Sequence, residues 1–192
     1  MHHFFAYVAK LKYILRWGLK RNVEVENVKE HSFDVASIAH ALAVIKNRMF
    51  DGNLDANQVA VIALYHDASE VLTGDLPGPI KYFNPAIAEA YKDVEKAAKA
   101  KLLTMLPEPL QPDYALLIND HQLSDSVRRL IKAADVISAY IKCVHEVESN
   151  NHEFLVAKDR VEGMLKQYEM PEVRYFMETF LPSYRLTLDE LG

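Results

Sequence analysis

The residues best suited to chemistry lie where an apolar stretch, VAVIALY, runs directly into the adjacent pair His66 and Asp67. Imidazole nitrogen and carboxylate oxygen are ligands that divalent transition metals accept together. A charge in apolar company must be paired or bound to a metal, so this pair needs partners from elsewhere in the chain. Two residues fit, His31 in KEHSFDVASIAH and Asp135 in LIKAADVISAY. The order His, His-Asp, Asp on three separate segments predicts a metal centre.

The spacing of these residues excludes the short-range metal motifs, because they are too far apart for a zinc finger or an HExxH helix. Asp135 strengthens the metal interpretation, since its neighbours in the chain are apolar and a buried acid needs a counter-charge. The alternative is that Asp135 pairs with Arg128 or Lys132. That alternative would leave the placement of His31 and His66 as coincidence.

Helical spacing of apolar residues recurs along the chain, whereas period-two alternation is nearly absent, so the sequence predicts an all-α fold. Asn84 and Pro85 are expected to begin one helix, and Ser124 or Asp125 to cap another. The glycines and prolines of 74–79 predict a loop without helix. The helix that follows Asp55 or Asn57 is expected to carry His66 and Asp67 near its end. Expected helices cover 4–15, 30–49, 57–67, 85–106, 113–121, 125–148, 153–168 and 172–190.

Bulk properties narrow the class of protein. A chain of 192 residues, 50% hydrophobic and 26% charged, is expected to form a single domain, 1–192. The net charge of −5 argues against a nucleic-acid polymer as partner, although it permits a nucleotide substrate. The single cysteine, Cys143, predicts no disulfide framework and a reducing compartment. With no membrane-spanning run or signal peptide in view, a cytoplasmic protein without a membrane partner is expected.

Longer motifs surround the predicted ligands. They are RWGLKRNV, EHSFDVA, YHDASEVLTGDLP, IKYFNP and FLPSYRLTLDEL, and they extend over essentially the whole chain. With these motifs the sequence resembles the HD-domain metal-dependent phosphohydrolases, and within them the bacterial 5′-deoxynucleotidases of the YfbR type. HD alone is a weak dipeptide, but HDASEVLTGDLP with an upstream Arg-Trp is far more specific. One departure is Gly78, where a hydroxyl residue is expected.

The resemblance implies an all-α helical bundle of the HD type with a metal site between helices. It implies hydrolysis of 2′-deoxyribonucleoside 5′-monophosphates to deoxyribonucleosides and phosphate, by a homodimer. One divalent cation, Co²⁺, Mn²⁺, Zn²⁺ or Fe²⁺, is expected, because all four accept mixed nitrogen and oxygen ligands. Its ligands are expected to be His31, His66, Asp67 and Asp135.

The resemblance and the side-chain chemistry together suggest individual roles. Glu70 lies one helical turn beyond Asp67 and is assigned to proton transfer, with a solvated surface acid as the alternative. Arg16 suits a phosphate clamp, Trp17 a wall against the sugar or base, and Asp75 an acceptor for a sugar hydroxyl. The expected catalytic residues are Glu70, Arg16 and Asp67, and the expected substrate contacts are Arg16, Trp17, His31, Asp67, Asp75, Leu76, Pro77 and Gly78.

Other functions fit the same motif order. A dNTP triphosphohydrolase or a cyclic-nucleotide phosphodiesterase would want more basic residues or further metal ligands than the sequence offers. A non-catalytic nucleotide-binding scaffold would be expected to lack one of the four ligands, and none is missing. Asp120 and His121 precede the segment of Asp135 and are candidates for a supporting pair behind the ligands.

Overall fold

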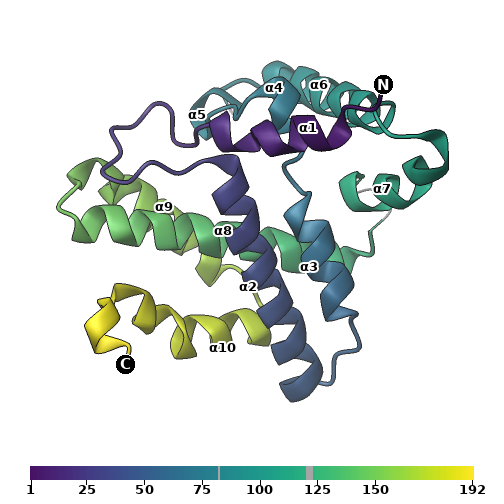
Figure 1. Ribbon diagram of the computed structural model, residues 1–192. Helices are drawn as coiled ribbons and strands as arrows, with labels where there is room; N and C mark the ends of the chain where they lie inside the picture. The colour runs from purple at the N-terminus through teal and green to yellow at the C-terminus, as the bar shows by residue number, and fades with distance from the viewer. Residues whose placement is uncertain (82, 120–122) are drawn as a thin grey trace. The chain divides into compact units, whose positions relative to one another are not determined.

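The computed structural model describes residues 1–81, 83–119 and 123–192, and helices dominate them (Figure 1). Among those residues the only β pairing is one antiparallel bridge between Leu15 and Asn27. The prediction of an all-α fold is therefore confirmed. The α-helices are α1 (Phe4–Val8), α2 (Val28–Met49), α3 (Ala56–Leu64), α4 (Glu70–Thr73), α5 (Gly78–Lys81), α6 (Pro85–Leu103), α7 (Gln111–Ile118), α8 (Asp125–Glu148), α9 (Leu155–Lys166) and α10 (Pro171–Thr179).

The chain forms two units whose segments alternate along the sequence. The first comprises Met1–Arg21, Val25–Phe33 and Leu64–Leu123, and the second comprises Asn22–Glu24, Asp34–Ala63 and Ser124–Gly192. No helix in the described part of the chain is long and apolar enough to cross a membrane. The expectation of one domain over 1–192 stays a prediction.

The core of the first unit supports the segment that carries the His-Asp pair. Phe4 of α1 packs edge-on against Tyr114 of α7, with ring centroids 5.0 Å apart, and Tyr65 meets the same ring at 5.9 Å. Ala68, just beyond Asp67, is buried in this cluster. Both flanks of the His-Asp pair are thus anchored by apolar burial, which holds the pair in place. The buried members of the core are Phe4, Ala68, Leu102, Leu106 and Ile118.

The second unit is built on α8, which packs along α9. Glu146 of α8 is buried and satisfied: it pairs with Lys142 and accepts hydrogen bonds from Asn151 Nδ2 at 2.7 Å and from the backbone amides of Val23 at 2.9 Å and Glu24 at 3.1 Å. A buried ion pair is tolerated when its remaining polar atoms are hydrogen-bonded, as here. This group of five residues is called the Glu146 network below.

The predicted helix starts at 84–85 and 124–125 are confirmed. Asn84 Oδ1 accepts from the amide of Ala86 at 2.7 Å, with Pro85 as the first helical residue of α6. Ser124 Oγ accepts from the amide of Val127 at 3.4 Å and caps α8. In both places the side chain satisfies an amide that has no partner within its helix.

Several helix boundaries differ from the prediction. The expected helix 4–15 is α-helical only over Phe4–Val8 and continues as a 3₁₀ helix over Ala9–Tyr13. Helix α3 ends at Leu64, so the His-Asp pair lies in the following turn and not on the helix. The segment 74–79 was expected to contain no helix, but α5 begins at Gly78, because the missing amide of Pro79 costs nothing in a first turn. The expected helix 172–190 ends at Thr179 and is followed by 3₁₀ turns, because Pro182 cannot continue it.

Candidate active site

The start of α2 places His31. Asn27 Oδ1 accepts from the amides of Lys29 and Glu30, both at 3.1 Å, and so caps the helix. His31 lies in the first turn behind this cap, where its amide donates to the carbonyl of Asn27 at 3.1 Å. Its side chain is completely buried. The capped start of α2 therefore holds the buried imidazole of His31 in the first unit.

The turn after α3 places His66 and Asp67. It is tight, with the amide of Ala68 donating to the carbonyl of Tyr65 and that of Glu70 to the carbonyl of Asp67, both at 3.0 Å. Adjacent side chains on a regular helix diverge, whereas in this turn they converge. His66 Nε2 lies 3.0 Å from Asp67 Oδ2. Ending the helix at Leu64 is thus what lets two neighbouring residues share one site.

The structure brings three of the four predicted metal ligands together. His31 Nε2 lies 3.7 Å from Asp67 Oδ2, and one ligand atom from each of His31, His66 and Asp67 lies within 4.8 Å of the others. Two imidazole nitrogens and one carboxylate oxygen suit a divalent transition metal, and three protein ligands leave a position for substrate or water. The side chains of this group therefore fit one cation.

Asp135, the fourth predicted ligand, belongs to the second unit. Its Oδ2 accepts from Lys132 Nζ at 2.6 Å, one turn earlier on α8. This is one of the two ion pairs that the sequence left open for it. Its membership of the ligand set stays a prediction that rests on motif order. Asp120 and His121 lie outside the described residues.

Glu70 is the first residue of α4 and has an unusual carboxyl group. Its Oε2 is buried and accepts no hydrogen bond from any residue that the structure describes. Burial raises the pKa of Glu70 to about 9, and the negative charges of Asp67 and Asp75 add to this rise, while Arg16 and Lys81 oppose it. The solvated-surface alternative for Glu70 is therefore excluded. A protonated acid beside possible metal ligands can donate a proton.

Asp75 lies in the same unit, directly after a turn at Gly74. Gly74 ends α4 with φ of +73°, a conformation that a side chain would strain, and its amide donates to the carbonyl of Glu70 at 2.8 Å. Burial raises the pKa of Asp75, while the charge of Arg16 and a hydrogen bond from the backbone amide of Trp17 oppose the rise. Asp75 is thus tied directly to the Arg-Trp segment.

The loop beyond Asp75 contains the other predicted substrate contacts. Leu76 and Pro77 are partly exposed, and Gly78 is exposed at the start of α5. A Cβ atom at Gly78 would meet nothing within 4 Å, so the hydroxyl residue expected there would fit without rearrangement. The glycine therefore changes the surface of this loop but not its path.

Arg16 and Trp17 both contact the carboxylate of Glu26, a residue that was not predicted from the sequence. Arg16 Nε and Trp17 Nε1 both donate to Glu26 Oε2, each at 2.9 Å. Arg16 Nη1 lies 3.6 Å from Asp67 Oδ2, which brings the guanidinium to the metal-ligand group. The only signal in the sequence was an acid within a polar loop, and that pattern does not distinguish Glu26 from Glu24.

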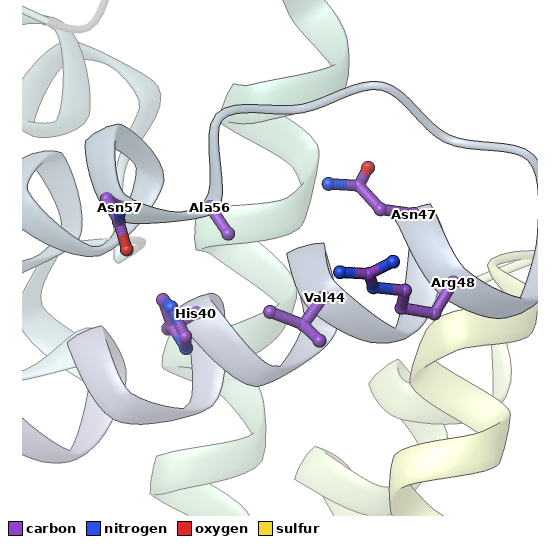
Figure 2. Close-up of a pocket in the computed structure, with 6 residues that line it drawn as sticks. All are labelled: His40, Val44, Asn47, Arg48, Ala56 and Asn57. Carbon is purple, nitrogen blue, oxygen red and sulfur yellow. The ribbon is translucent and has the colours of Figure 1, made fainter.

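A separate hollow in the second unit contains none of the predicted site residues (Figure 2). Its volume is about 300 Å³, and amide, imidazole and guanidinium groups line it without a carboxylate. Arg48 and Asn57 on its rim are exposed. It offers no set of metal ligands, so the candidate active site is the group in the first unit. The lining residues are His40, Val44, Asn47, Arg48, Ala56 and Asn57.

Known proteins resemble this chain over nearly its full length. A family model described as "5′-deoxynucleotidase YfbR-like" matches residues 3–184. A 5′-deoxynucleotidase of Yersinia pseudotuberculosis is 54% identical over 192 residues, which are 100% of this chain and 98% of that protein. A 5′-deoxynucleotidase of Enterobacter sp. strain 638 is 54% identical over 190 residues, 99% of this chain and 96% of that protein.

Solved structures resemble the fold. An HD-domain phosphohydrolase of Listeria innocua is 24% identical and superposes with a TM-score of 0.84, over 95% of this chain and 88% of that one. The HD phosphohydrolase of cyanophage S-2L, solved bound to dA and one catalytic Zn²⁺ ion, is 20% identical with a TM-score of 0.63, over 95% and 96%. At these identities the likeness identifies the all-α HD-domain fold and nothing finer.

Proposed function

Because this chain belongs to the YfbR-like 5′-deoxynucleotidase family, we infer that it hydrolyses 2′-deoxyribonucleoside 5′-monophosphates to deoxyribonucleosides and phosphate. The observation that carries this inference is the group of His31, His66 and Asp67, whose ligand atoms converge within 4.8 Å. Arg16 and the buried acid Glu70 stand beside that group. A cation site, a phosphate clamp and a proton donor are the parts that hydrolysis of a phosphate monoester needs.

We propose that His31, His66 and Asp67 hold the cation, with Asp135 as fourth ligand on the strength of the motif order. When bound, the cation supplies Lewis-acid chemistry, polarising a phosphoryl oxygen and making water more acidic. The ion is one of Co²⁺, Mn²⁺, Zn²⁺ and Fe²⁺, since mixed nitrogen and oxygen ligands suit all four. Asp67 Oδ2 also lies 3.6 Å from Arg16 Nη1, so the proposed ligand and the proposed phosphate clamp form an ion pair.

Glu70 is proposed as the proton donor to the departing 5′ oxygen. Its carboxyl group is buried and holds its proton at neutral pH, since its pKa is raised to about 9. Arg16 offers two terminal nitrogens in a planar fork that matches two phosphate oxygens. The clamp holds the phosphate while the acid neutralises the leaving group, so neither group needs to move between binding and proton transfer.

Selection of the sugar is proposed to come from Asp75 and Trp17. Asp75 accepts a hydrogen bond from the 3′ hydroxyl, which both kinds of sugar carry, and fixes the orientation of the nucleotide. Trp17 forms a wall that leaves a 2′ hydroxyl without a partner. Burying an unpaired hydroxyl costs about 1–3 kcal/mol, which is about 5- to 150-fold in preference for the deoxy sugar. The backbone of Leu76, Pro77 and Gly78 lines the same subsite.

The test is phosphate release from dAMP, dTMP, AMP, dATP and 3′-dAMP (2′-deoxyadenosine 3′-monophosphate), with each candidate metal restored after chelation. We expect turnover of the two deoxynucleoside 5′-monophosphates, with AMP and 3′-dAMP largely rejected. Asp67→Ala serves as the control, because it removes a ligand and is expected to lose both turnover and metal. Equal kcat/KM for AMP and dAMP would refute the deoxy selectivity, and faster release from dATP would move the activity to triphosphates.

Three further properties are proposed, the dimer on the family resemblance and the other two on the cysteine content and the net charge. The protein is a homodimer of single-domain chains, it works in the cytoplasm, and it binds no nucleic-acid polymer. Cys143 supports the second, since it is the single cysteine of the sequence and is completely buried on α8, so the chain contains no internal disulfide. Light scattering at low micromolar concentration tests the dimer, and a monomer at that concentration would contradict it.

A further inference from the structure

We propose that Glu26 is a positioning residue that couples the phosphate clamp to the sugar wall, so that one carboxylate sets both turnover and deoxy selectivity. The proposal rests on the proposed function, because it assigns Arg16 to the phosphate and Trp17 to the sugar. It goes further in one respect. It makes the two subsites depend on a residue that touches neither the cation nor the nucleotide.

The geometry is a single acceptor shared by two donors. Arg16 Nε and Trp17 Nε1 each lie 2.9 Å from Glu26 Oε2. The side chains of Arg16 and Glu26 are only 13% and 12% exposed, so water competes weakly for this ion pair. Engaging Nε fixes the plane of the guanidinium and leaves its terminal nitrogens on the side of Asp67. Engaging the indole fixes the ring of Trp17 at the same time.

The backbone around Trp17 needs such a restraint. Trp17 has φ of +59°, a left-handed conformation that costs a bulky residue about 1–3 kcal/mol. The loop is closed by the bridge between Leu15 and Asn27, and the amide of Arg16 donates to the carbonyl of Glu26 at 3.0 Å. Glu26 therefore restrains the loop through its main chain and its side chain together.

The same conformation extends the coupling to Asp75. The backbone amide of Trp17 donates to the Asp75 carboxylate, so the left-handed turn connects the indole wall to the proposed acceptor of the 3′ hydroxyl. Loosening the indole removes one of the restraints on this turn. The sugar subsite is thereby predicted to lose orientation as well as its wall.

Charge alone does not explain why an acid occupies this position. Glu26 adds a negative charge close to the place where an anionic phosphate is proposed to bind, which weakens attraction for the substrate. A purely electrostatic role therefore predicts that Glu26→Gln lowers KM without lowering kcat. A positioning role predicts a fall in kcat and in selectivity, because a neutral amide oxygen holds the two donors more weakly than a charged carboxylate does, and the amide NH2 group cannot accept either of them.

The experiment uses Trp17 as its own reporter, since it is the single tryptophan of the chain. The variants are Glu26→Gln and Glu26→Asp, with Glu24→Gln as control, because Glu24 is exposed in the same loop and its removal changes the net charge equally. Acrylamide quenching and anisotropy of Trp17 fluorescence are measured without nucleotide. Steady-state kinetics are then measured with dAMP and AMP.

We expect Glu26→Gln to increase the quenching of Trp17 and to reduce the dAMP preference. We also expect it to lower kcat for dAMP by about 10- to 100-fold, which is the range for residues that orient metal ligands and is applied to Arg16 and Trp17 by analogy. Glu26→Asp keeps the charge but shortens the reach, so it falls between wild type and Glu26→Gln. Glu24→Gln behaves as wild type. In a Trp17→Ala background, Glu26→Gln lowers the dAMP preference no further, because the group it orients is gone.

Quenching and selectivity of Glu26→Gln equal to those of Glu24→Gln would overturn the proposal, as would a lower KM with unchanged kcat. If no nucleotide is hydrolysed by the wild type, the proposed function fails, whereas the fluorescence still decides whether Glu26 holds the indole. Should Glu26→Gln fold poorly, Glu26→Asp supplies the same comparison. A melting temperature unchanged in either variant confirms that the kinetic losses come from the site.

Discussion

Glu70 in the first unit and Glu146 in the second both have a buried carboxyl oxygen, and the surroundings of the two carboxyl groups are opposite. Glu70 Oε2 has no hydrogen-bond partner among the described residues, and two further acids, Asp67 and Asp75, act on it. Glu146 accepts hydrogen bonds from Lys142, Asn151 and two backbone amides. Burial would raise both pKa values, and only Glu146 has the donors that overcome it: the pKa of Glu70 is about 9 and that of Glu146 about 2.

The difference shows how the surroundings of a glutamate decide whether it stabilises the fold as a charged group or keeps a proton for the reaction. The Glu146 network stabilises the charged form, so breaking it costs folding free energy. Glu70 is kept in its neutral form, which costs stability but keeps a proton available within the group of proposed ligands. The comparison therefore predicts opposite outcomes for conservative changes at the two positions.

The largest effect is expected at Glu70. Glu70→Gln preserves the size and the neutral form of the side chain but removes its proton transfer, so kcat for dAMP should fall by about 10²–10⁴-fold. Metal content should be unchanged, and the free energy of unfolding should be raised at neutral pH, because Gln does not carry the cost of a carboxyl whose pKa is raised on folding. Stopped-time phosphate assays, metal analysis and urea unfolding measure the three quantities. A near-normal kcat at every pH would remove Glu70 from proton transfer.

A large effect on stability, not on chemistry, is expected at Glu146. Glu146→Ala leaves the Lys142 ammonium buried without its carboxylate, and removing one partner of a buried pair costs about 3–5 kcal/mol. The matched control is Glu162→Ala on α9, since Glu162 pairs with Lys166 at 2.8 Å on the surface, where such pairs contribute about 0–1 kcal/mol. Urea unfolding compares them, with kcat per folded molecule unchanged in both. Equal losses of stability would end the distinction between the two glutamates.

The sequence predicted the parts of the molecule that depend on local chemistry. Asn84-Pro85 and Ser124 act as helix starts because their side chains satisfy amides a few residues away. The order His31, His66-Asp67 identified three side chains that the structure brings together. Residue type and spacing along the chain were sufficient in these cases.

Features that depend on contacts distant in sequence were not predictable. Glu26 and Glu24 look alike in a polar loop, yet one side chain holds Arg16 and Trp17 while the other is exposed. The Glu146 network joins positions more than 100 residues apart, and no local pattern indicates it. The turn at His66 also escaped prediction, because an apolar, alanine-rich run favours helix until tertiary packing ends it.

The two glutamates should also give opposite pH dependence of stability, measured as melting temperature after chelation. Glu146 has its pKa lowered from 4.5 to about 2, so its contribution is present above pH 4.5 and is lost as the pH falls toward 2. Glu70 has its pKa raised from 4.5 to about 9, so its contribution is present below pH 4.5 and is lost as the pH rises toward 9.

The measurement is the difference in melting temperature between wild type and each Gln variant from pH 3 to pH 9. The difference for Glu146→Gln should grow as the pH rises from 3 to 5 and then stay level. For Glu70→Gln, the melting temperature of the variant should rise steadily relative to that of wild type between pH 5 and pH 9. Parallel curves would show that the surroundings of the two acids do not govern their protonation.

The smallest effect is expected from Lys81, whose positive charge is one of several charges that act on Glu70, whereas Lys142 pairs directly with Glu146. Lys81 Nζ lies 2.8 Å from Glu95 Oε1 and 4.9 Å from the centroid of the Tyr91 ring, and its charge opposes the rise in the pKa of Glu70. Because Glu95 offsets part of that charge, and because burial and other charges dominate, Lys81→Met should raise the pKa of Glu70 only slightly further.

The observable is the alkaline limb of kcat against pH for dAMP, which should move to higher pH in Lys81→Met as the acid keeps its proton longer. Lys92→Met is the control, because Lys92 is an exposed lysine on α6 that pairs only with surface Glu89 at 3.1 Å among the contacts described. A shift to lower pH, or one no larger than in Lys92→Met, would mean that Lys81 does not act on Glu70. Arg16, which forms an ion pair with Glu26, would then be the remaining positive charge that lowers the pKa of Glu70.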